Sequence, residues 1–562
     1  GMDIYSFAVD FGTTNTHIEY QVNNQAPKPF EITNQDYQTV SLFDPSLTDS
    51  DFASMDAIEI KDLIDMEFVP FKLGSNEIAN FPLRTSICDS KNINPTQTAW
   101  TLADLNIPFT YLKVTMPSRY YSITTNLKWG EAIPGIDHKI KAYFEQLIML
   151  IRNKVLMNGG NLSQTKLTWF YPTSMNSHLQ GQMGRMWNEL TNEYFGSEEI
   201  ATTKIAESLA PFYYYRNQGD VMGNYRPVIS FDIGGGTSDV VIFKHDKPII
   251  LTSIKFAGNT IFGDFNNTMG GNSIGIHSKY KQHFQDLLNN NNLNHLSGLL
   301  EGDKAEEINA FLFSLENNSK IQDSQLFSYN RKLNADNDLK IIFLYFYCSL
   351  VYHIAELMKK ENLELPQKIL YSGTGSKILG IIDADQQAAN LCKISRLIFE
   401  KVYESNYDVK ENLLEIIQER NKPKEITCKG GLYSQELLEQ IVPSEITKTH
   451  HCLKDIETLY LKDLDNDLYM NEIIDHVKKF NDVFIGLNLE LNFNDHFGIS
   501  VESFTLFKAK MNRELREYLE SMKSSMQYSE DEAIKETLFF HPIAGVISKL
   551  SKELSQLNPL NL

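Results

Sequence analysis

Residues 228–243 read VISFDIGGGTSDVVIF, and this stretch decides the fold class. Two apolar, β-forming runs, Val228–Phe231 and Val240–Phe243, flank a turn that contains Asp232, three consecutive glycines and Thr237. Glycine inside a regular element costs roughly 0.5–1 kcal/mol relative to alanine. Three in a row therefore favour a place where a ligand or another backbone approaches closely, with a flexible hairpin turn as the alternative.

A second stretch near the N-terminus has the same plan. Residues 7–16 read FAVDFGTTNT, so that Asp10 stands at the end of an apolar run and Gly12, Thr13 and Thr14 follow it. We expect strands at 6–10 and 16–21 to form a hairpin around this turn. Each turn places a carboxylate at a strand end, followed by backbone N–H groups that can face an anion. Two such turns predict two jaws that close on one phosphate chain with its metal.

Length and charge limit the function classes. The chain has 562 residues, which suggests three or four folding units. Lys plus Arg number 52 and Asp plus Glu number 72, for a net charge of −20. This charge argues against non-specific binding to nucleic acid or to an anionic membrane. A bound nucleotide would need local backbone dipoles and Mg²⁺ to overcome the negative field.

Cysteine usage predicts a reduced, cytoplasmic protein. The five cysteines are scattered and form no CxxC pair, and no basic and apolar leader of a signal peptide precedes the first strand. His450-His451-Cys452 has no second ligand pair at the usual spacing, so we interpret it as a surface turn rather than a metal site. The apolar run Ile341–Ala355 is short for a membrane span and predicts a buried core helix.

The order of expected elements repeats once along the chain. Each half has two strands around a glycine-rich turn, a third strand, helices, and a further strand. Residues 279–338, rich in asparagine and charge, are expected to form an inserted helical subdomain. After residue 434 the pattern turns helical, as in 502–522 and 542–557, and carries no motif that we can tie to chemistry.

Three segments resemble signature motifs of the actin-like ATPase superfamily, which includes actin, the heat-shock chaperone ATPase domains and the sugar kinases. DFGTTNT resembles the first phosphate motif, DIGGGTSD the second, and LYSGTGSK at 370–377 the adenosine motif. Softer likenesses run through LTWFYPTSMNSHLQGQM, KIAESLAPFYYY, IKFAGNTIFGD and KEITCKGGL. The resemblance covers roughly residues 3 to 441 and is nearest to the chaperone-type ATPase domain.

This resemblance implies an α/β fold with two RNase-H-like domains around a nucleotide cleft, plus a helical C-terminal region. We expect actin-like ATPase domain I at 3–225, domain II at 226–433 with the insert at about 279–338, and the C-terminal region at 434–562. ATP and Mg²⁺ are the implied cofactors.

The resemblance also implies roles for individual residues. Asp10 and Asp232 would hold waters on the Mg²⁺, and Glu207, helped by Asp239, would orient the attacking water. The remaining residues implied at the nucleotide are, at the phosphates, Gly12, Thr13, Thr14, Gly234, Gly235, Gly236 and Thr237; at the adenosine, Gly373, Gly375 and Lys377; and, lining the nucleotide from the second domain, Gly258 and Asn259.

The chain departs from the family pattern in three places. The chaperones use a domain I lysine near the γ-phosphate, and we assign this role to Lys128, with Lys113 as the second choice. Thr374 and Lys377 stand where chaperones tend to have glycine and arginine. The proline that often follows the family glutamate is missing after Glu207, so nucleotide binding is better supported than hydrolysis.

The leading hypothesis is a Mg-ATP-dependent ATPase whose domain closure couples nucleotide state to a protein partner through the C-terminal or inserted region. A small-molecule kinase of the sugar-kinase branch and a non-hydrolysing, nucleotide-dependent scaffold or filament protein are the alternatives. The C-terminal region would be either a partner surface or a stabilising cap over domain I.

Overall fold

The computed structural model divides the chain into two compact units. The first contains Gly1–Gln218 and Lys424–Ile441, and the second contains Gly219–Pro423 and Val442–Leu562. The structure describes residues 1–13, 15–32, 38–39, 72–73, 79–90, 105–106, 121–125, 127–129, 135–173, 175, 177–196, 202–221, 226–263, 275–291, 293–301, 305–315, 321, 328–408, 414–419, 424–438, 440–454, 456, 458–526 and 533–556. The domain boundaries expected near residues 225 and 433 remain predictions.

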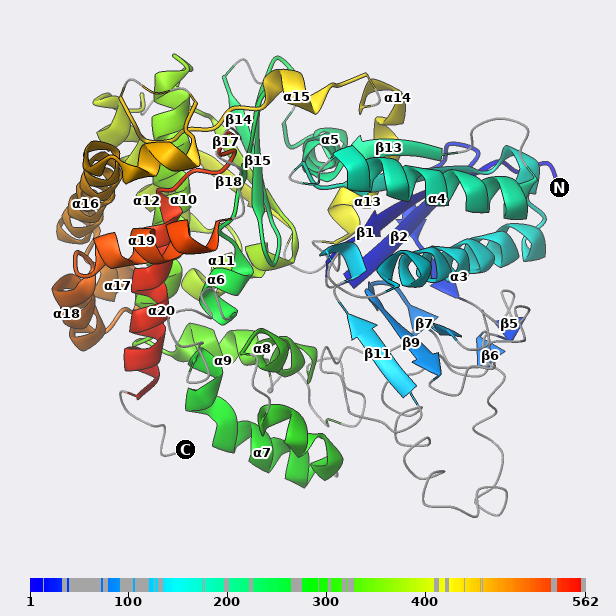
Figure 1. Ribbon diagram of the computed structural model, residues 1–562, viewed down its shortest axis with the longest axis horizontal. Coiled ribbons are helices and arrows are strands. Elements are labelled where there is room, and N and C mark those ends of the chain that lie inside the picture. Colours follow the sequence, from blue (N-terminus) through cyan, green and yellow to red (C-terminus); the bar gives the residue numbers. More distant parts are fainter. Residues whose placement is uncertain are drawn as a thin grey trace. The chain divides into compact units, whose positions relative to one another are not determined.

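The first unit is built on a mixed sheet in the order β13-β12-β1-β2-β3 (Figure 1). Strands β1 and β2 are antiparallel, whereas β12 and β13 both run parallel to β1. The carboxyl ends of β1, β12 and β13 therefore meet at one edge of the sheet. The strand bounds are β1 Tyr5–Phe11, β2 Asn15–Val22, β3 Lys28–Pro29, β12 Lys166–Tyr171 and β13 Thr202–Ala206, with β8 (Leu83–Arg84) also paired to β2.

Helices cover both faces of this sheet because strand side chains alternate between the faces. Phe11 packs edge-on against Phe144 of α3 (Ile136–Met157), which stacks in turn on Trp187 of α4 (Ser177–Phe195). On the opposite face, α13 (Glu425–Tyr433) lies against β1 and β2 and contacts α5 (Ala210–Asn217). Smaller pairings join β9 (Ser86–Ser90) to β10 (Leu105–Asn106) and β11 (Tyr121–Thr125), β4 (Glu31–Ile32) to β7 (Ala79–Asn80), and β5 (Gln38–Thr39) to β6 (Lys72–Leu73).

The second unit repeats the strand plan of the first. Its sheet has the order β16-β15-β14-β17-β18, and β14 is again antiparallel to its hairpin partner and parallel to the strand on its other side. The bounds are β14 Val228–Ile233, β15 Ser238–Lys244, β16 Lys247–Ile254, β17 Lys368–Ser372 and β18 Glu415–Gln418. In chain order both sheets read 3-2-1-4-5, which is the strand order of RNase-H-like domains.

The centre of the second unit is α10 (Lys340–Lys360). It is the one helix in the described residues that is long and apolar enough to cross a membrane, but 94% of its most apolar window is buried in the protein. The prediction of a buried core helix is confirmed. The helix is longer than the apolar run 341–355, because Glu356, Lys359 and Lys360 continue it with polar side chains.

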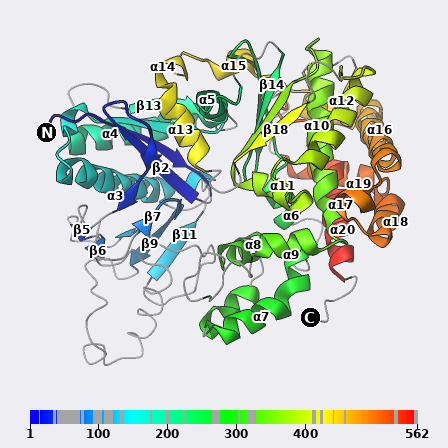
Figure 2. The ribbon, with the colours of Figure 1, turned by 180° about the vertical axis from the view of Figure 1, so that it is seen from behind.

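The helices after residue 442 pack on α10. Figure 2 shows α10, α12 (Ala389–Tyr403) and α16 (Asp467–Leu491) side by side, and these helices contact one another. Tyr345 of α10 lies between the rings of Phe480 and Phe507, with centroids 5.4 and 4.8 Å away. The expectation of a cap over domain I is therefore wrong, because the apolar face that these helices cover belongs to α10.

The other helices of the second unit complete its inserted and C-terminal regions. In the insert, Lys279 of η7 pairs with Asp336 at 2.7 Å, and both side chains are buried. The bounds are α6 Gly258–Phe262, η7 Ile276–Tyr280, α7 Lys281–Asn290, η8 Asn294–Glu301, α8 Ala305–Ser314, α9 Tyr329–Ala335, η10 Thr374–Lys377, α11 Ile378–Ile382, α15 Pro443–Ile446, η11 Leu461–Asp465, α17 Phe493–Phe497, α18 Val501–Lys510, α19 Leu515–Ser525 and α20 Phe540–Gln556.

The interpretation of His450-His451-Cys452 as a surface turn is wrong. The three residues are 7%, 3% and 8% exposed. They are buried because α10 and α16 bring further rings against this loop; the centroids of His353 and His476 lie 5.4 and 6.1 Å from that of His450.

The α/β fold class is confirmed. Two sheets with one strand plan, a glycine-rich hairpin in each, and a helical region after residue 442 match the fold that the sequence motifs predicted.

Candidate functional site

The first predicted turn closes the hairpin of β1 and β2. The Gly12 N–H donates to the carbonyl oxygens of Asp10 (3.1 Å) and Asn15 (3.2 Å). A Cβ atom on Gly12 would lie 2.4 Å from the Asn15 oxygen and 2.8 Å from Nζ of Lys424. Glycine is required here by the chain itself, because any side chain would collide with the opposite strand. Thr14 lies outside the described residues.

Asp10 forms an ion pair that the sequence did not predict. Its Oδ2 accepts a hydrogen bond from Nζ of Lys424 at 2.8 Å, and Asp10 is only 4% exposed. Lys424 directly precedes α13, the helix that lies against β1 and β2. The packing of that helix brings a cation to the first phosphate-type turn.

Glu207 and Lys128 are brought together. Glu207 begins the 3₁₀ helix η5 (Glu207–Leu209) directly after β13, so it stands at the same sheet edge as Asp10. Its Oε2 accepts a hydrogen bond from Nζ of Lys128 at 3.1 Å, and the Lys128 side chain is buried. One strand, β12, separates β1 from β13, so Asp10 and Glu207 stand on the order of 10 Å apart along the edge.

The second predicted turn closes the hairpin of β14 and β15. In its register Asp232 pairs with Asp239, and the Gly234 N–H donates to the Thr237 carbonyl oxygen at 2.9 Å. Asp239 is buried. Gly236 is exposed, and a Cβ atom built on it would have no other atom within 4 Å. The described residues therefore give no steric reason for glycine at this position.

Two predicted segments of the second unit converge on this turn. The N–H groups of Gly258 and Asn259 donate to the carbonyl oxygens of Gly234 and Gly235, at 3.1 and 2.8 Å. From the other side, a Cβ on Gly375 would lie 2.7 Å from the Gly234 oxygen.

The backbone of the adenosine-type segment, at Gly373 and Gly375, lies directly against the second glycine-rich turn. Gly373 has a φ of +79°, which favours glycine, and a Cβ on it would lie 2.3 Å from Oδ1 of Asp232. Lys377 is exposed at the end of η10. The backbone of this segment is thus held against the second turn, while its lysine is open to solvent.

Each unit presents a carboxylate that suits a hard cation. Asp10 and Asp232 each present carboxylate oxygens at the end of the first strand of a sheet, and Mg²⁺ takes oxygen ligands and keeps several of its waters. The Lys424 ammonium already neutralises part of the Asp10 charge. Within its own unit, each of these carboxylates has the chemistry for indirect binding of Mg²⁺ through water.

Sequence reasoning missed Lys424. It lies in the quoted segment KEITCKGGL, but a lysine at the start of a helix is ordinarily a solvated side chain. Its partner Asp10 is 414 positions away in the chain, so no local spacing marks the pair.

No family model and no curated protein matches the chain. Among solved structures, it is similar to MreB5 of Spiroplasma citri bound to ADP, at 11% identity and a TM-score of 0.34, covering 78% of this chain and 97% of that one. A non-polymerising mutant of MamK bound to AMPPNP has 11% identity and a TM-score of 0.32, with 78% and 100% covered. The ethanolamine utilization protein EutJ from Carboxydothermus hydrogenoformans has 10% identity and a TM-score of 0.30, with 76% and 89% covered.

The repeated strand plan, with a glycine-rich hairpin at the same place in both sheets, decides the fold. The chain has the actin-like fold. Within it, the first unit of this actin-like chain brings together Asp10, Glu207 and Lys128 at one sheet edge, and the second brings together Asp232, the glycine turn and the adenosine-type segment.

Proposed function

We propose that this actin-like chain binds Mg-ATP through its two glycine-rich turns and hydrolyses it, and that nucleotide state is passed to a protein partner. The observation that carries the proposal is the open space at Gly236 in the second glycine-rich turn. No contact in the described part of the chain would prevent a side chain at this position. The nearest atoms to a Cβ there lie more than 4 Å away, so the space suits a ligand that approaches the backbone.

In this proposal the residues act by position and charge. The N–H groups of Gly12 and Gly234 bond within their hairpins, so the other N–H groups of the two turns would face the phosphates. Lys424 and Lys128 supply positive charge close to these turns in a protein of net charge −20. Asp10 and Asp232 would hold Mg²⁺ through water, and the ion when bound would neutralise phosphate charge. Glu207, fixed by Lys128, would orient the attacking water, and Gly373, Gly375 and Lys377 would hold the adenosine.

The test is calorimetric titration of the chain with ATP, with and without Mg²⁺, followed by measurement of phosphate release. We expect Mg²⁺-dependent binding, and we expect Gly236→Ala to weaken it about tenfold, or ~1.4 kcal/mol. The free energy of unfolding of this variant should change by less than about 0.5 kcal/mol. Wild-type affinity in Gly236→Ala would remove the main support for the proposal.

Gly298→Ala is the matched control. Gly298 is also exposed with open space around a built Cβ, but it lies in η8, away from the glycine-rich turns along the chain. Its nucleotide affinity should equal that of the wild type. Binding without phosphate release would support a nucleotide-dependent scaffold instead of an ATPase.

A further inference from the structure

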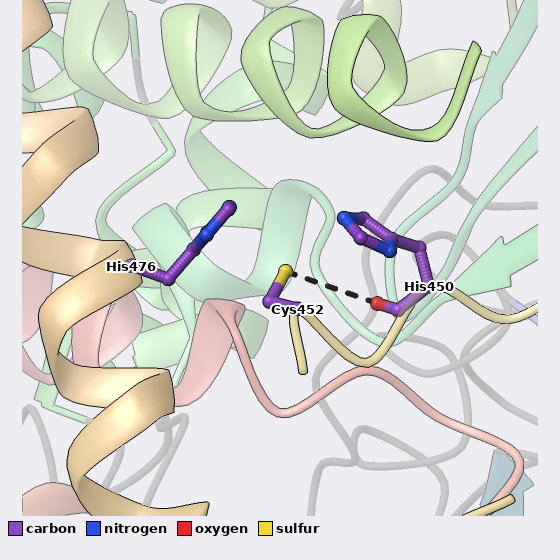
Figure 3. Close-up of side chains that lie close together, drawn as sticks. All are labelled: His450, Cys452 and His476. Atoms are coloured by element: carbon purple, nitrogen blue, oxygen red, sulfur yellow. Dashed lines mark hydrogen bonds between the residues drawn. The ribbon is translucent and has the colours of Figure 1, made fainter. Parts of the chain in front are cut away.

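A buried group of histidine and cysteine side chains lies where the loop before η11 meets α16. His450 and Cys452 belong to the loop, and His476 belongs to α16. One ligand atom from each of these three residues lies within 4.8 Å of the other two. Figure 3 shows the sulfur of Cys452 between the two imidazole rings.

Four imidazole nitrogens in or beside this group have no hydrogen-bond partner among the described residues. Neither ring nitrogen of His450 has one, although the residue is only 7% exposed. Nε2 of His476 and Nε2 of the fully buried His353, on α10, also lack one. Burying a polar atom without a partner is unfavourable, so four such nitrogens in one place need an explanation.

Packing of aromatic rings explains only part of this arrangement. The ring of His353 stacks on Phe539 with centroids 5.4 Å apart, and His476 meets Phe539 edge-on at the same distance. Phenylalanine could make these contacts without burying a lone pair. The contacts therefore account for the rings but not for the nitrogens.

A transition-metal ion gives a partner to one nitrogen of each imidazole and to the sulfur of Cys452. Zn²⁺ binds imidazole nitrogen at about 2.0–2.1 Å and thiolate sulfur at about 2.3 Å, so tetrahedral donors stand roughly 3.5 Å apart. The sulfur of Cys452 is already 3.8 Å from Nδ1 of His353. One ligand atom each of His450, Cys452 and His476 lies within 4.8 Å of the other two, so side-chain shifts on the order of 1 Å bring these three donors to this spacing.

A metal at this group requires neutral imidazoles and a thiolate. Burial, helped by the neighbouring His476, lowers the pKa of His450 to about 3, so its imidazole is neutral at pH 7. Burial raises the pKa of the Cys452 thiol, and a bound cation has to displace this proton to form the thiolate. Glu356 adds negative charge near Cys452 and His476, but Lys479, which pairs with Glu356 at 3.3 Å, adds positive charge near the same two residues. Lys360 adds positive charge near Cys452 and His450.

We propose that His450, Cys452 and His476 bind a zinc-class transition-metal ion, with His353 as the fourth donor. The ion joins the loop and α16 to α10, and so fixes the C-terminal helices on the core of the second unit. Phe539, Phe540 and Tyr352 pack around the rings, and a site closed in this way serves structure rather than catalysis.

The test uses the full chain, purified without chelators, and measures its metal content by mass spectrometry. About one zinc per chain is expected, and none in Cys452→Ser or His476→Ala. Replacement by Co²⁺ should give the visible bands of a tetrahedral site and a thiolate-to-cobalt band in the near ultraviolet. Removal of the metal should lower the melting temperature of the wild type but not that of Cys452→Ser.

Cys348→Ala and His283→Ala are the matched controls, since Cys348 is another buried thiol and His283 another half-buried histidine. Both should keep the metal. The cobalt spectrum of the wild type decides the question even if a variant fails to fold. A wild-type chain that neither retains zinc nor takes up cobalt, or a Cys452→Ser chain that binds either ion as tightly, would overturn the proposal.

Discussion

At the scale of single residues, the pair of Lys424 and Asp10 links the first glycine-rich turn to α13. The ammonium lies 2.8 Å from the carboxylate oxygen, and the aspartate side chain is 6% exposed. A carboxylate this buried is costly without a counter-ion. Lys424 therefore stabilises the folded turn and also neutralises the negative charge of Asp10.

Replacing Lys424 with Met should lower the free energy of unfolding by about 1–3 kcal/mol, because Asp10 is then left buried and unpaired. Millimolar Mg²⁺ without nucleotide should restore part of this loss in the variant and leave the wild type unchanged. Urea denaturation with and without Mg²⁺ measures both effects.

The double variant Asp10→Asn with Lys424→Met is the control for this pair. It should be nearly as stable as Asp10→Asn alone, because the interaction has already been removed. Additive losses from the two changes would show that the ion pair contributes nothing.

The raised pKa of Glu19 predicts how the free energy of unfolding depends on pH. Burial raises its pKa above the ordinary value of 4.5, although His17, 2.8 Å away, and Lys429 act in the opposite direction. The folded state thus holds the Glu19 proton more tightly than the unfolded state does. The contribution of this proton to the free energy of unfolding is fully present below pH 4.5 and is lost as the pH rises through the pKa of the folded state. A tenfold difference in proton affinity between the folded and unfolded states corresponds to about 1.4 kcal/mol.

Glu19→Gln cannot ionise, so it should gain stability relative to the wild type as the pH rises from 4.5 to 7. Denaturation at the two pH values measures this gain. Glu445→Gln, at an exposed position of α15, should show no such change. If the free energies of unfolding of Glu19→Gln and the wild type differed by the same amount at both pH values, the Glu19 pKa would not be raised in the folded state.

At the scale of elements, the two hairpins could be predicted because their signals are local. Alternating or continuous apolar runs bounded by Gly and Asp fixed the strands around residues 10 and 232 to within one or two positions. The end of α10 could not be read in this way, because its last turn is polar and continues beyond the apolar run to Lys360.

The parts of the site that the sequence did not predict depend on contacts between distant elements. Lys424 reaches Asp10 only because α13 lies across β1 and β2. Cys452 meets His353, 99 positions earlier, only because the C-terminal loop packs on α10. Spacing along the chain carries no trace of either contact. Glu207 could be named because its segment resembles a known pattern, and Lys128 was assigned only because the chaperone pattern includes a domain I lysine.

At the scale of the whole molecule, the C-terminal helices are part of the core of the second unit rather than an appended module. Asn481 of α16 is fully buried, and its Oδ1 accepts a hydrogen bond from the Tyr345 hydroxyl of α10 at 2.6 Å. Its amide nitrogen donates to the carbonyl oxygen of Met511 at 3.0 Å and to Oδ1 of Asn512 at 2.8 Å. One side chain thus ties three segments together.

Asn481→Ala should lower the free energy of unfolding by about 2–4 kcal/mol, because it leaves the Tyr345 hydroxyl and the Met511 carbonyl buried without partners. Since α10 also packs on the sheet through Tyr347 and Tyr371, the loss should spread to β14 and β17. Hydrogen exchange should show these strands losing protection by the same free energy as α16. Tyr345→Phe should cost less, and the two changes together less than their sum. If exchange quickened in α16 while β14 and β17 kept their wild-type protection, the C-terminal helices would be a separable module, and a role in relaying nucleotide state would need another route.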